Sequence, residues 1–252
     1  MAEIQPFAGI RYRGLDLSRV LAPPYDVISE AYRADLCARD PHNVVRLILA
    51  RDQDDAGYEE AGETYRRWLG EGVLEPDPEP GLYVLEQTFP VAGKGLRRFG
   101  VLARFRAEDA ARRIILPHEH TRAAAKEDRF RLLKATRANF SPIFLMFPDP
   151  TAGFSPLVLE AIGHPPVAQY ADDGGIGHRL WHVRDDAAIA RFRALLGSVP
   201  AYIADGHHRH ATALRYRDEV GPDGFIMAMG CAIPPDAKFE NVKAMVDSVQ
   251  GK

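Results

Sequence analysis

The sequence is poor in cysteine and has no long apolar run. Its two cysteines, Cys37 and Cys231, form neither a paired motif nor a metal-ligand spacing, which argues against a disulfide-stapled secreted domain. No stretch approaches the roughly 18 apolar residues that span a bilayer. Residues 1–9 also lack the basic start and apolar stretch of a signal peptide. We therefore expect a protein of the reducing cytoplasm without a membrane partner.

The chain also lacks a strong charge of either sign. Its formal net charge is −3, so no overall positive field favours nucleic acid, although a local basic patch is compatible with this value. Hydrophobic residues make up 46% of the chain, which is enough for one large domain or two small ones. We expect a small-molecule substrate as the partner, and the oligomeric state stays open.

Short apolar runs alternate with amphipathic segments, which predicts an α/β (α+β) fold with a mixed sheet. Ser29 is a predicted N-cap, and a turn around residues 93–95 is expected to join two strands into a hairpin. Strands are expected at residues 44–49, 82–89, 97–106, 141–147, 180–183 and 201–204. Helices are expected at residues 29–39, 57–71, 124–138, 155–163, 187–196 and 210–219.

The proline-rich stretch 76–80 is a stiff connector and the best candidate for a boundary within the chain. It divides an N-terminal α/β part, residues 1–80, from the rest. Residues 81–150 are expected to form an insertion with the hairpin and a basic helix. Residues 151–252 then carry the most polar motif of the sequence.

That motif is Asp205-Gly206-His207-His208-Arg209, which follows the apolar run 201–204. A strand, a glycine loop and a helix in succession present backbone N–H groups to an anion. Arginine forks onto phosphate or carboxylate, imidazoles transfer protons near neutral pH, and aspartate orients an imidazole or holds a divalent cation. The alternative interpretation is a polar turn in which Asp205 caps the helix.

A second cluster, His118-Glu119-His120, follows the apolar residues 114–116. In an extended segment the two histidines share one side and could supply a base or a metal ligand. The spacing differs from that of zinc proteases, which place histidines at i and i+4 on a helix. A solvated loop is the alternative. Because strand ends gather ligand sites in α/β sheets, we expect this cluster and the Asp205 motif to line one cleft.

The expected helix 124–138 is basic. On a helix, Arg122, Lys126 and Arg129 share one face through i,i+4 and i,i+3 steps, and that face could bind phosphates. A solvated basic helix is the alternative interpretation.

Seven stretches, in order from residue 6 to about 219, form a specific set. They are Pro6-Phe7 with Arg11-Tyr12; Pro23-Pro24-Tyr25-Asp26-Val27-Ile28; Pro41 with Asn43-Val44-Val45-Arg46-Leu47; Pro117-His118-Glu119 with Thr121; Lys126 with Asp128-Arg129; Ser141-Pro142-Ile143-Phe144; and Ile203-Ala204-Asp205-Gly206-His207-His208-Arg209. As a set they resemble the bacterial and archaeal family known as domain of unknown function 1015. The resemblance implies no particular activity.

The Asp205 motif is also similar to the phosphate-binding loop of the ParB and sulfiredoxin-like fold, which includes nucleotide-dependent enzymes such as free-serine kinases. This similarity implies that Gly206, His207 and Arg209 bind phosphates and that Asp205 holds a metal ion. The chain departs from the 1015 family in two ways. It has His210-Ala211 where members have Tyr-Glu, and it stops where members continue. These departures predict a truncated or divergent member and keep an inactive protein among the alternatives.

Our first hypothesis is a nucleotide-dependent phosphotransferase for a small metabolite, using a nucleoside di- or triphosphate with Mg²⁺. In this hypothesis His118 or Glu119 is the base. The catalytic set is His118, Glu119, Asp205, His207 and His208; Gly206, Arg209, Lys126 and Arg129 bind the cofactor, and Asp205 binds the metal. The alternatives are a metal-dependent hydrolase that uses the same clusters, and a non-catalytic nucleotide-binding or regulatory protein.

Overall fold

The computed structural model describes residues 2–50, 54–118, 123–221 and 225–233. Within these residues the main feature is a nine-stranded sheet with the strand order β6-β10-β7-β11-β5-β4-β9-β8, in which β1 also pairs with β5. The strands are β1 Ile4–Gln5, β4 Leu82–Val91, β5 Lys94–Arg106, β6 Ile115–Leu116, β7 Ile143–Pro148, β8 Ala168–Ala171, β9 Gly177–Val183, β10 Ala201–Asp205 and β11 Phe225–Ile233.

The sheet is mixed, as the sequence predicts. Strand β10 runs parallel to β6, and β11 runs parallel to β7, while the other pairs are antiparallel. The predicted hairpin is formed by β4 and β5. Its two turn residues, Ala92 and Gly93, both have positive φ, which suits the right-handed twist of the paired strands.

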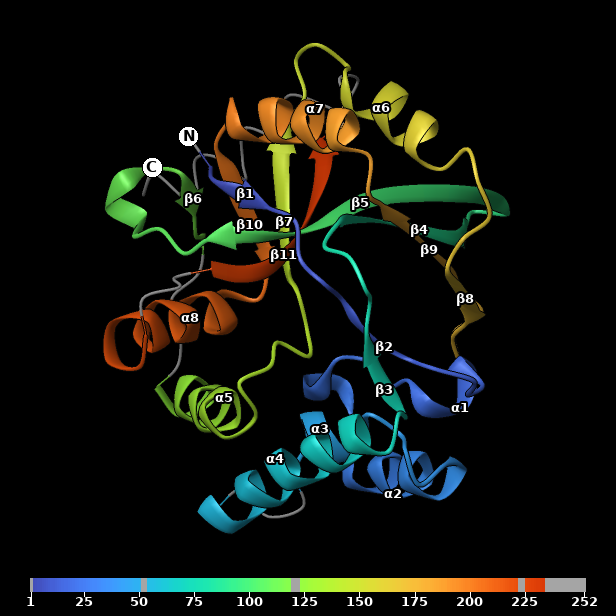
Figure 1. Ribbon diagram of the computed structural model, residues 1–252, viewed down its shortest axis with the longest axis vertical. Helices are drawn as coiled ribbons and strands as arrows, with labels where there is room; N and C mark the ends of the chain where they lie inside the picture. The colour runs from blue at the N-terminus through green and yellow to red at the C-terminus, as the bar shows by residue number, and fades with distance from the viewer. Residues whose placement is uncertain (1, 51–53, 119–122, 222–224, 234–252) are drawn as a thin grey trace.

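Helices cover both faces of this sheet (Figure 1). Helices α6 (Phe154–Ala161) and α7 (Asp186–Gly197) lie on one face, and α5 (Ala123–Thr136) and α8 (His207–Glu219) lie on the other. The core under α6 and α7 interleaves sheet residues with helix residues; it includes Val84, Val101, Leu145, Ile203, Phe154, Val158 and Phe192. The described helices include none that is long and apolar enough to cross a membrane.

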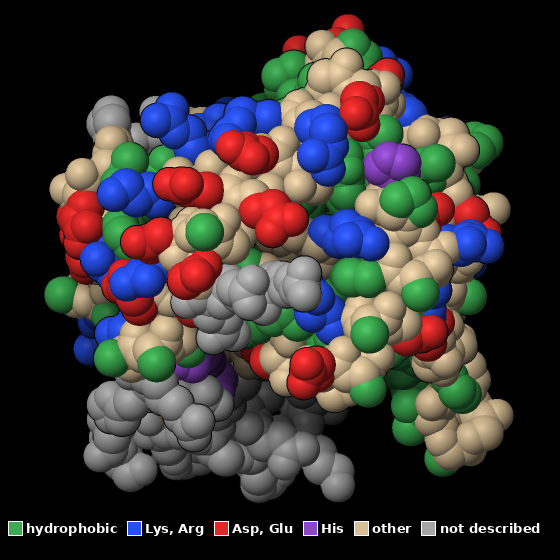
Figure 2. All heavy atoms as spheres, turned by 90° about the horizontal axis from the view of Figure 1, so that it is seen from below, with side chains coloured by type: hydrophobic (Ala, Val, Ile, Leu, Met, Phe, Trp, Pro, Cys, Tyr) green, Lys and Arg blue, Asp and Glu red, His purple; other side chains and the backbone are tan. Residues whose placement is uncertain are grey.

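The N-terminal part forms a smaller assembly below the sheet. It contains a two-stranded sheet and a set of helices around Trp68, which is 1% exposed. Its elements are β2 Ile10–Tyr12, α1 Leu17–Val20, the 3-10 turn Tyr25–Val27, α2 Glu30–Arg39, α3 Val45–Ile48, α4 Asp55–Gly70 and β3 Leu74–Pro76; a second 3-10 turn, Ala110–Arg112, precedes β6. From below, acidic and basic side chains are interspersed on this face rather than separated by sign (Figure 2).

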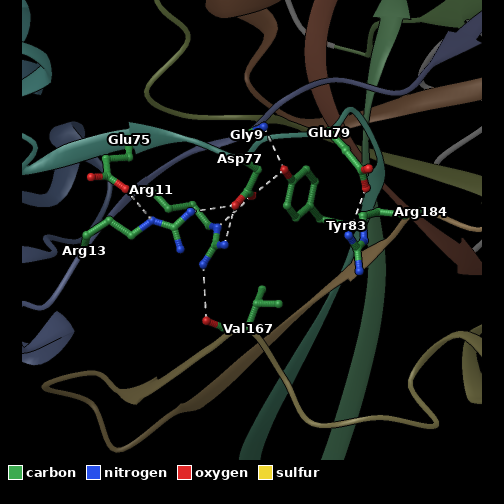
Figure 3. A network of polar contacts seen from close by, with 9 residues as sticks. All are labelled: Gly9, Arg11, Arg13, Glu75, Asp77, Glu79, Tyr83, Val167 and Arg184. Atoms are coloured by element: carbon green, nitrogen blue, oxygen red, sulfur yellow. Dashed lines mark hydrogen bonds and ion pairs between the residues drawn. The ribbon is translucent and has the colours of Figure 1, made fainter.

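A buried carboxylate joins the N-terminal part to the main sheet (Figure 3). Asp77 follows β3 and its side chain is 2% exposed. It accepts hydrogen bonds from Arg11 and Arg13 of the N-terminal part and from the hydroxyl of Tyr83 on β4. That hydroxyl in turn accepts from the backbone N–H of Gly9. This carboxylate therefore ties the small sheet to the large one.

The predicted strand 44–49 is wrong, because this apolar run forms the short helix α3. The buried side chain of Asn43 accepts from Val45 N and donates to the carbonyls of Arg19 and Leu21, which stabilises a helical start. Since α3 is buried on several sides, its apolar residues show no helical period, and a short apolar run of this kind does not distinguish helix from strand.

The start of one helix and the presence of one strand in the last described part of the chain also differ from expectation. Helix α8 begins at His207, not at residue 210, so His207, His208 and Arg209 lie in its first turn and not in a loop. No strand or helix is expected from the sequence after residue 219, yet Phe225–Ile233 forms β11, which inserts between β5 and β7.

Candidate functional site

The two histidine clusters meet where two neighbouring strands end. Strands β6 and β10 are parallel and pair Leu116 with Tyr202, so the segments that follow them leave the same edge of the sheet. The ring of His118 contacts the ring of His207 edge-on, with 4.4 Å between the ring centroids. The structure thus brings together two segments that are 89 positions apart in the sequence.

A hydrogen bond joins the two segments. Nε2 of His207 accepts from the backbone N–H of His118 at 3.3 Å. His207 is also buried. In this arrangement His207 positions the end of β6 against α8, and the proton-transfer role assigned to it remains a prediction.

One turn along α8, His210 is 4% exposed. Burial, with a smaller contribution from the nearby His207, lowers the pKa of His210 to about 4. It is therefore neutral at physiological pH. Position 210 therefore holds an uncharged, buried imidazole beside the first turn of α8.

Gly206 has the backbone conformation that the motif requires, with φ +95°. A Cβ at this position would lie 3.0 Å from Nε of Arg209, because the guanidinium packs directly over the glycine. Arg209 also donates to the carbonyl of Pro142 and to the carboxylate of Asp205. The side chain of Asp205 is 64% exposed, so this carboxylate points to solvent at the start of α8.

Arg209 also lines a small, partly open pocket between the N-terminal part, α5 and α8. Its cavity volume is about 50 Å³, room for a few water molecules. The lining residues are Tyr25, Ile48, Arg129, Leu132, Leu133, Ala138, Asn139, Phe140, Ser141, Arg209 and Thr212. Tyr25, Arg129, Ser141 and Arg209 belong to four of the seven stretches described above, and the fold brings them to one place.

Arg129 is held rigidly in this pocket. Its guanidinium donates to Asp128 and to the carbonyl of Ile48, and it lies over the ring of Tyr25 at 3.8 Å from the ring centre. Asp128 also accepts from the hydroxyl of Tyr58. Although Arg129 is only 9% exposed, its charge is therefore paired and its plane is fixed.

The remaining residues chosen from the sequence lie in several places. The backbone carbonyl of Lys126 accepts from Thr212 where α5 meets α8, and its partly buried side chain is not among those lining the pocket. His208 is partly buried beside His207. Glu119, His120 and Arg122 lie outside the described residues. Within the described part of the chain, no three His, Cys, Asp or Glu side chains group as ligands for a metal ion.

Sequence reasoning missed Tyr25, Asn139 and Thr212 as pocket residues. Asp26, the neighbour of Tyr25, is exposed and does not line the pocket. The rigid Pro23-Pro24 pair before Tyr25 was the available signal, because it fixes the direction from which the ring enters the pocket.

The fold and site define a mixed α/β protein with a small pocket between two arginines. A family model described as "Protein of unknown function (DUF1015)" matches residues 4–236, and the chain belongs to this family. The match confirms the resemblance inferred from the seven stretches. No curated protein and no solved structure matches the chain.

Proposed function

We propose that this protein is a nucleotide-dependent phosphotransferase that acts on a small metabolite. One observation carries the proposal: Arg129 and Arg209, from two different helices, line one pocket, and the helix that carries Arg209 begins beside the exposed carboxylate of Asp205 and the contact between His118 and His207. Fixed positive charges next to an acid–base group are what phosphoryl transfer needs, because its catalysis is mostly positioning and charge neutralisation.

In this proposal the phosphates of the nucleotide lie at the start of α8, where Arg209 neutralises negative charge. The acceptor hydroxyl attacks the terminal phosphorus while the bond from that phosphorus to the bridging oxygen breaks. The hydroxyl proton passes to His118, and the nucleoside diphosphate leaves. Glu119, the other candidate base, lies outside the described residues and remains a candidate.

The residues at this position fit a magnesium ion that arrives with the nucleotide. Mg²⁺ bound to phosphates needs only one or two carboxylates from the protein and keeps several waters. Asp205 supplies one carboxylate, and its exposure leaves room for those waters. The ion would neutralise phosphate charge, while Arg209 keeps the Asp205 carboxylate oriented.

The first test is a thermal-shift screen over nucleoside di- and triphosphates, each with and without magnesium. A ligand that binds only the folded protein raises Tm by mass action. We expect stabilisation by at least one nucleotide that increases with magnesium, and loss of this increase in Asp205→Asn. A flat screen across all nucleotides would contradict the proposal.

The second test is the Arg209→Ala variant. It should weaken nucleotide binding tenfold or more, about 1.5–3 kcal/mol, for the loss of a charged hydrogen bond. Arg217→Ala is a matched control, because Arg217 lies on the same helix and also donates to a carbonyl and an aspartate, Ala107 and Asp109. Equal affinities in the two variants would assign Arg209 a purely structural role.

Two other functions are distinguished by further readouts. Nucleotide binding without turnover against any acceptor would favour the non-catalytic binding protein. About one zinc per chain by elemental analysis, lost in His118→Ala, would favour the metal-dependent hydrolase.

A further inference from the structure

The β4–β5 hairpin extends beyond the strands on either side of it (Figure 1). Strand β9 pairs with β4 only as far as Thr88, and β11 pairs with β5 only from Val101 onward. Residues 94–99 of β5 therefore form a strand edge that no other described strand covers. We propose that this edge binds an extended acidic segment of a partner protein, which adds to the sheet as a further strand. The inference does not depend on the proposed phosphotransferase.

The two outer edges of the hairpin differ in their capacity to pair. The residue pair next to the two-residue turn exchanges hydrogen bonds, and bonded and non-bonded pairs alternate from there. The N–H and C=O groups of Gly95, Arg97 and Phe99 consequently point away from β4. The outward position on β4 is Pro90, which has no N–H. The edge of β4 is thus blocked by proline, whereas the edge of β5 keeps its donors and acceptors.

The charge of this edge favours an acidic partner. Beyond Glu86, the projecting part of the hairpin carries three exposed cations, Lys94, Arg97 and Arg98, and no acidic residue. The buried Glu86 pairs with both Arg97 and Arg179, so one carboxylate holds two half-exposed arginines in place. Opposite charges on facing strands stabilise a pair, and like charges destabilise it. The edge therefore disfavours the same edge of a second copy of the chain.

The side chains of the edge define the pattern of the added strand. In chain order they are Lys94, Gly95, Leu96, Arg97, Arg98 and Phe99. Leu96 is 44% exposed and Phe99 is half-buried, so both can pack against apolar side chains of a neighbouring strand. Antiparallel pairing is the more stable arrangement, and it meets these residues in reverse order. The matching segment reads, from its N-terminus, apolar, acidic, acidic, apolar, small, acidic.

The exposed apolar side chains favour a peptide over nucleic acid. Leu96 and Val91 are 44% and 47% exposed, and Arg98 lies over the ring of Phe89. Phosphate contacts use cations alone, and the net charge of −3 opposes the approach of a polyanion more than that of a short peptide. An acidic and apolar strand uses the backbone groups, the cations and the apolar side chains of the edge together.

The test is fluorescence anisotropy with the full chain and a labelled short peptide that carries the matching pattern. The controls are a peptide with the same residues in scrambled order and two peptides with N-methyl groups on alternate residues, one in each phase. We expect the matching peptide to bind and the scrambled peptide to bind at least tenfold more weakly. Binding should be lost in only one N-methylated peptide, because every second N–H of an added strand faces β5. No binding of the matching peptide, or equal loss in both N-methylated peptides, would overturn the inference.

Two substitutions at one position test the edge itself. Gly95→Pro removes an outward N–H, as Pro90 does on β4, and should raise Kd for the matching peptide at least fivefold. Gly95→Ala is the matched control, because its Cβ meets nothing within 4 Å and its N–H stays. Equal affinities in the two variants, with both folded by circular dichroism, would exclude strand addition at β5.

The contribution of charge is tested separately. Lys94→Gln should raise Kd about three- to fivefold, with a smaller effect at high salt. Arg191→Gln removes the same charge from α7, where Arg191 pairs with Glu160, and should leave Kd unchanged. Equal effects of the two substitutions would contradict charge matching at the edge. Displacement of the peptide by an oligonucleotide or by phosphatidylserine vesicles, weakened in Lys94→Gln, would assign the edge to another class of partner and overturn the inference.

Discussion

At the scale of single residues, the site shows how burial gives similar side chains different properties. His118 and His210 are both imidazoles near the start of α8. His118 follows a strand and its backbone N–H is held by His207, whereas His210 lies inside the α8 packing and is 4% exposed. Removing an imidazole from water disfavours its charged form, so the pKa of His210 falls to about 4. Because such a group binds a proton more readily in the unfolded chain than in the folded one, it makes the free energy of unfolding depend on pH.

His210 therefore predicts a loss of stability in mild acid. Unfolded histidine has a pKa of about 6.5, so between pH 6.5 and 4 the unfolded chain binds a proton that the folded chain does not. The stability that the neutral His210 contributes is fully present above pH 6.5 and is lost as the pH falls. This loss in the free energy of unfolding reaches about 3 kcal/mol near pH 4. Urea unfolding of the wild type and of His210→Gln from pH 4 to 7.5 measures the difference. Parallel pH profiles would contradict this assignment.

At the scale of elements, the sequence predicted those helices and turns that are determined by residues close together in the chain. The Ser29 cap was correct: its hydroxyl accepts from Tyr32 N, and α2 runs over Glu30–Arg39. The β4–β5 hairpin was also found. The failures, α3 and β11, are elements whose surroundings come from distant parts of the chain: α3 is buried on several sides, and β11 pairs with β5 and β7.

The difference between local and long-range determinants also applies to the residues of the candidate site. Gly206 and Arg209 stand out in the sequence because they lie three positions apart in one motif and have complementary chemistry. Tyr25 and Ser141 are ordinary residues on their own, and only the packing of the N-terminal part against α5 and α8 brings them to the pocket. No spacing within the sequence encodes that meeting, which joins residues more than a hundred positions apart.

The start of α8 offers a prediction at this scale. Gly206→Ala and Gly93→Ala both place a side chain at positive φ, which costs about 1 kcal/mol. A Cβ meets nothing within 4 Å at Gly93, but it meets the guanidinium of Arg209 at Gly206. We therefore expect Gly206→Ala to cost about 2 kcal/mol in urea unfolding and to weaken nucleotide binding, while Gly93→Ala leaves binding unchanged.

A second background separates the two contributions at Gly206. In an Arg209→Ala chain the crowding is gone, so adding Gly206→Ala should cost no more than Gly93→Ala does. If the full cost persists in that background, the strain comes from the backbone alone and not from the guanidinium packed over it.

At the scale of the whole molecule, the pocket lies between two parts that are tied at separate places. On one side, Arg129 on α5 donates to Ile48 and Tyr58 on α4 donates to Asp128. On the other, Tyr32 and Arg39 of α2 bind Asp173 in the β8–β9 turn. The Asp77 cluster lies between β3 and β4 and completes the connection. The width of the pocket depends on these ties, because Tyr25 and Ile48 come from the N-terminal part.

Asp77 is the most buried of these ties, and its removal should affect both stability and binding. Burial alone would raise the pKa of this carboxyl, but hydrogen bonds from Arg11 and Tyr83 hold it below its ordinary value. Asp77→Asn keeps the shape but leaves Arg11 without its charge partner and Arg13 with the half-exposed Glu75 alone, which should cost about 3 kcal/mol in urea unfolding. Glu79→Gln is the matched control two residues away, because the Glu79–Arg184 pair is exposed and should contribute less than about 1 kcal/mol. Since the same carboxylate positions the N-terminal wall of the pocket, Asp77→Asn should also weaken nucleotide binding while Glu79→Gln does not. A variant that loses stability but binds the nucleotide as tightly as the wild type would show that the pocket is fixed by the ties at α5 and α2 alone.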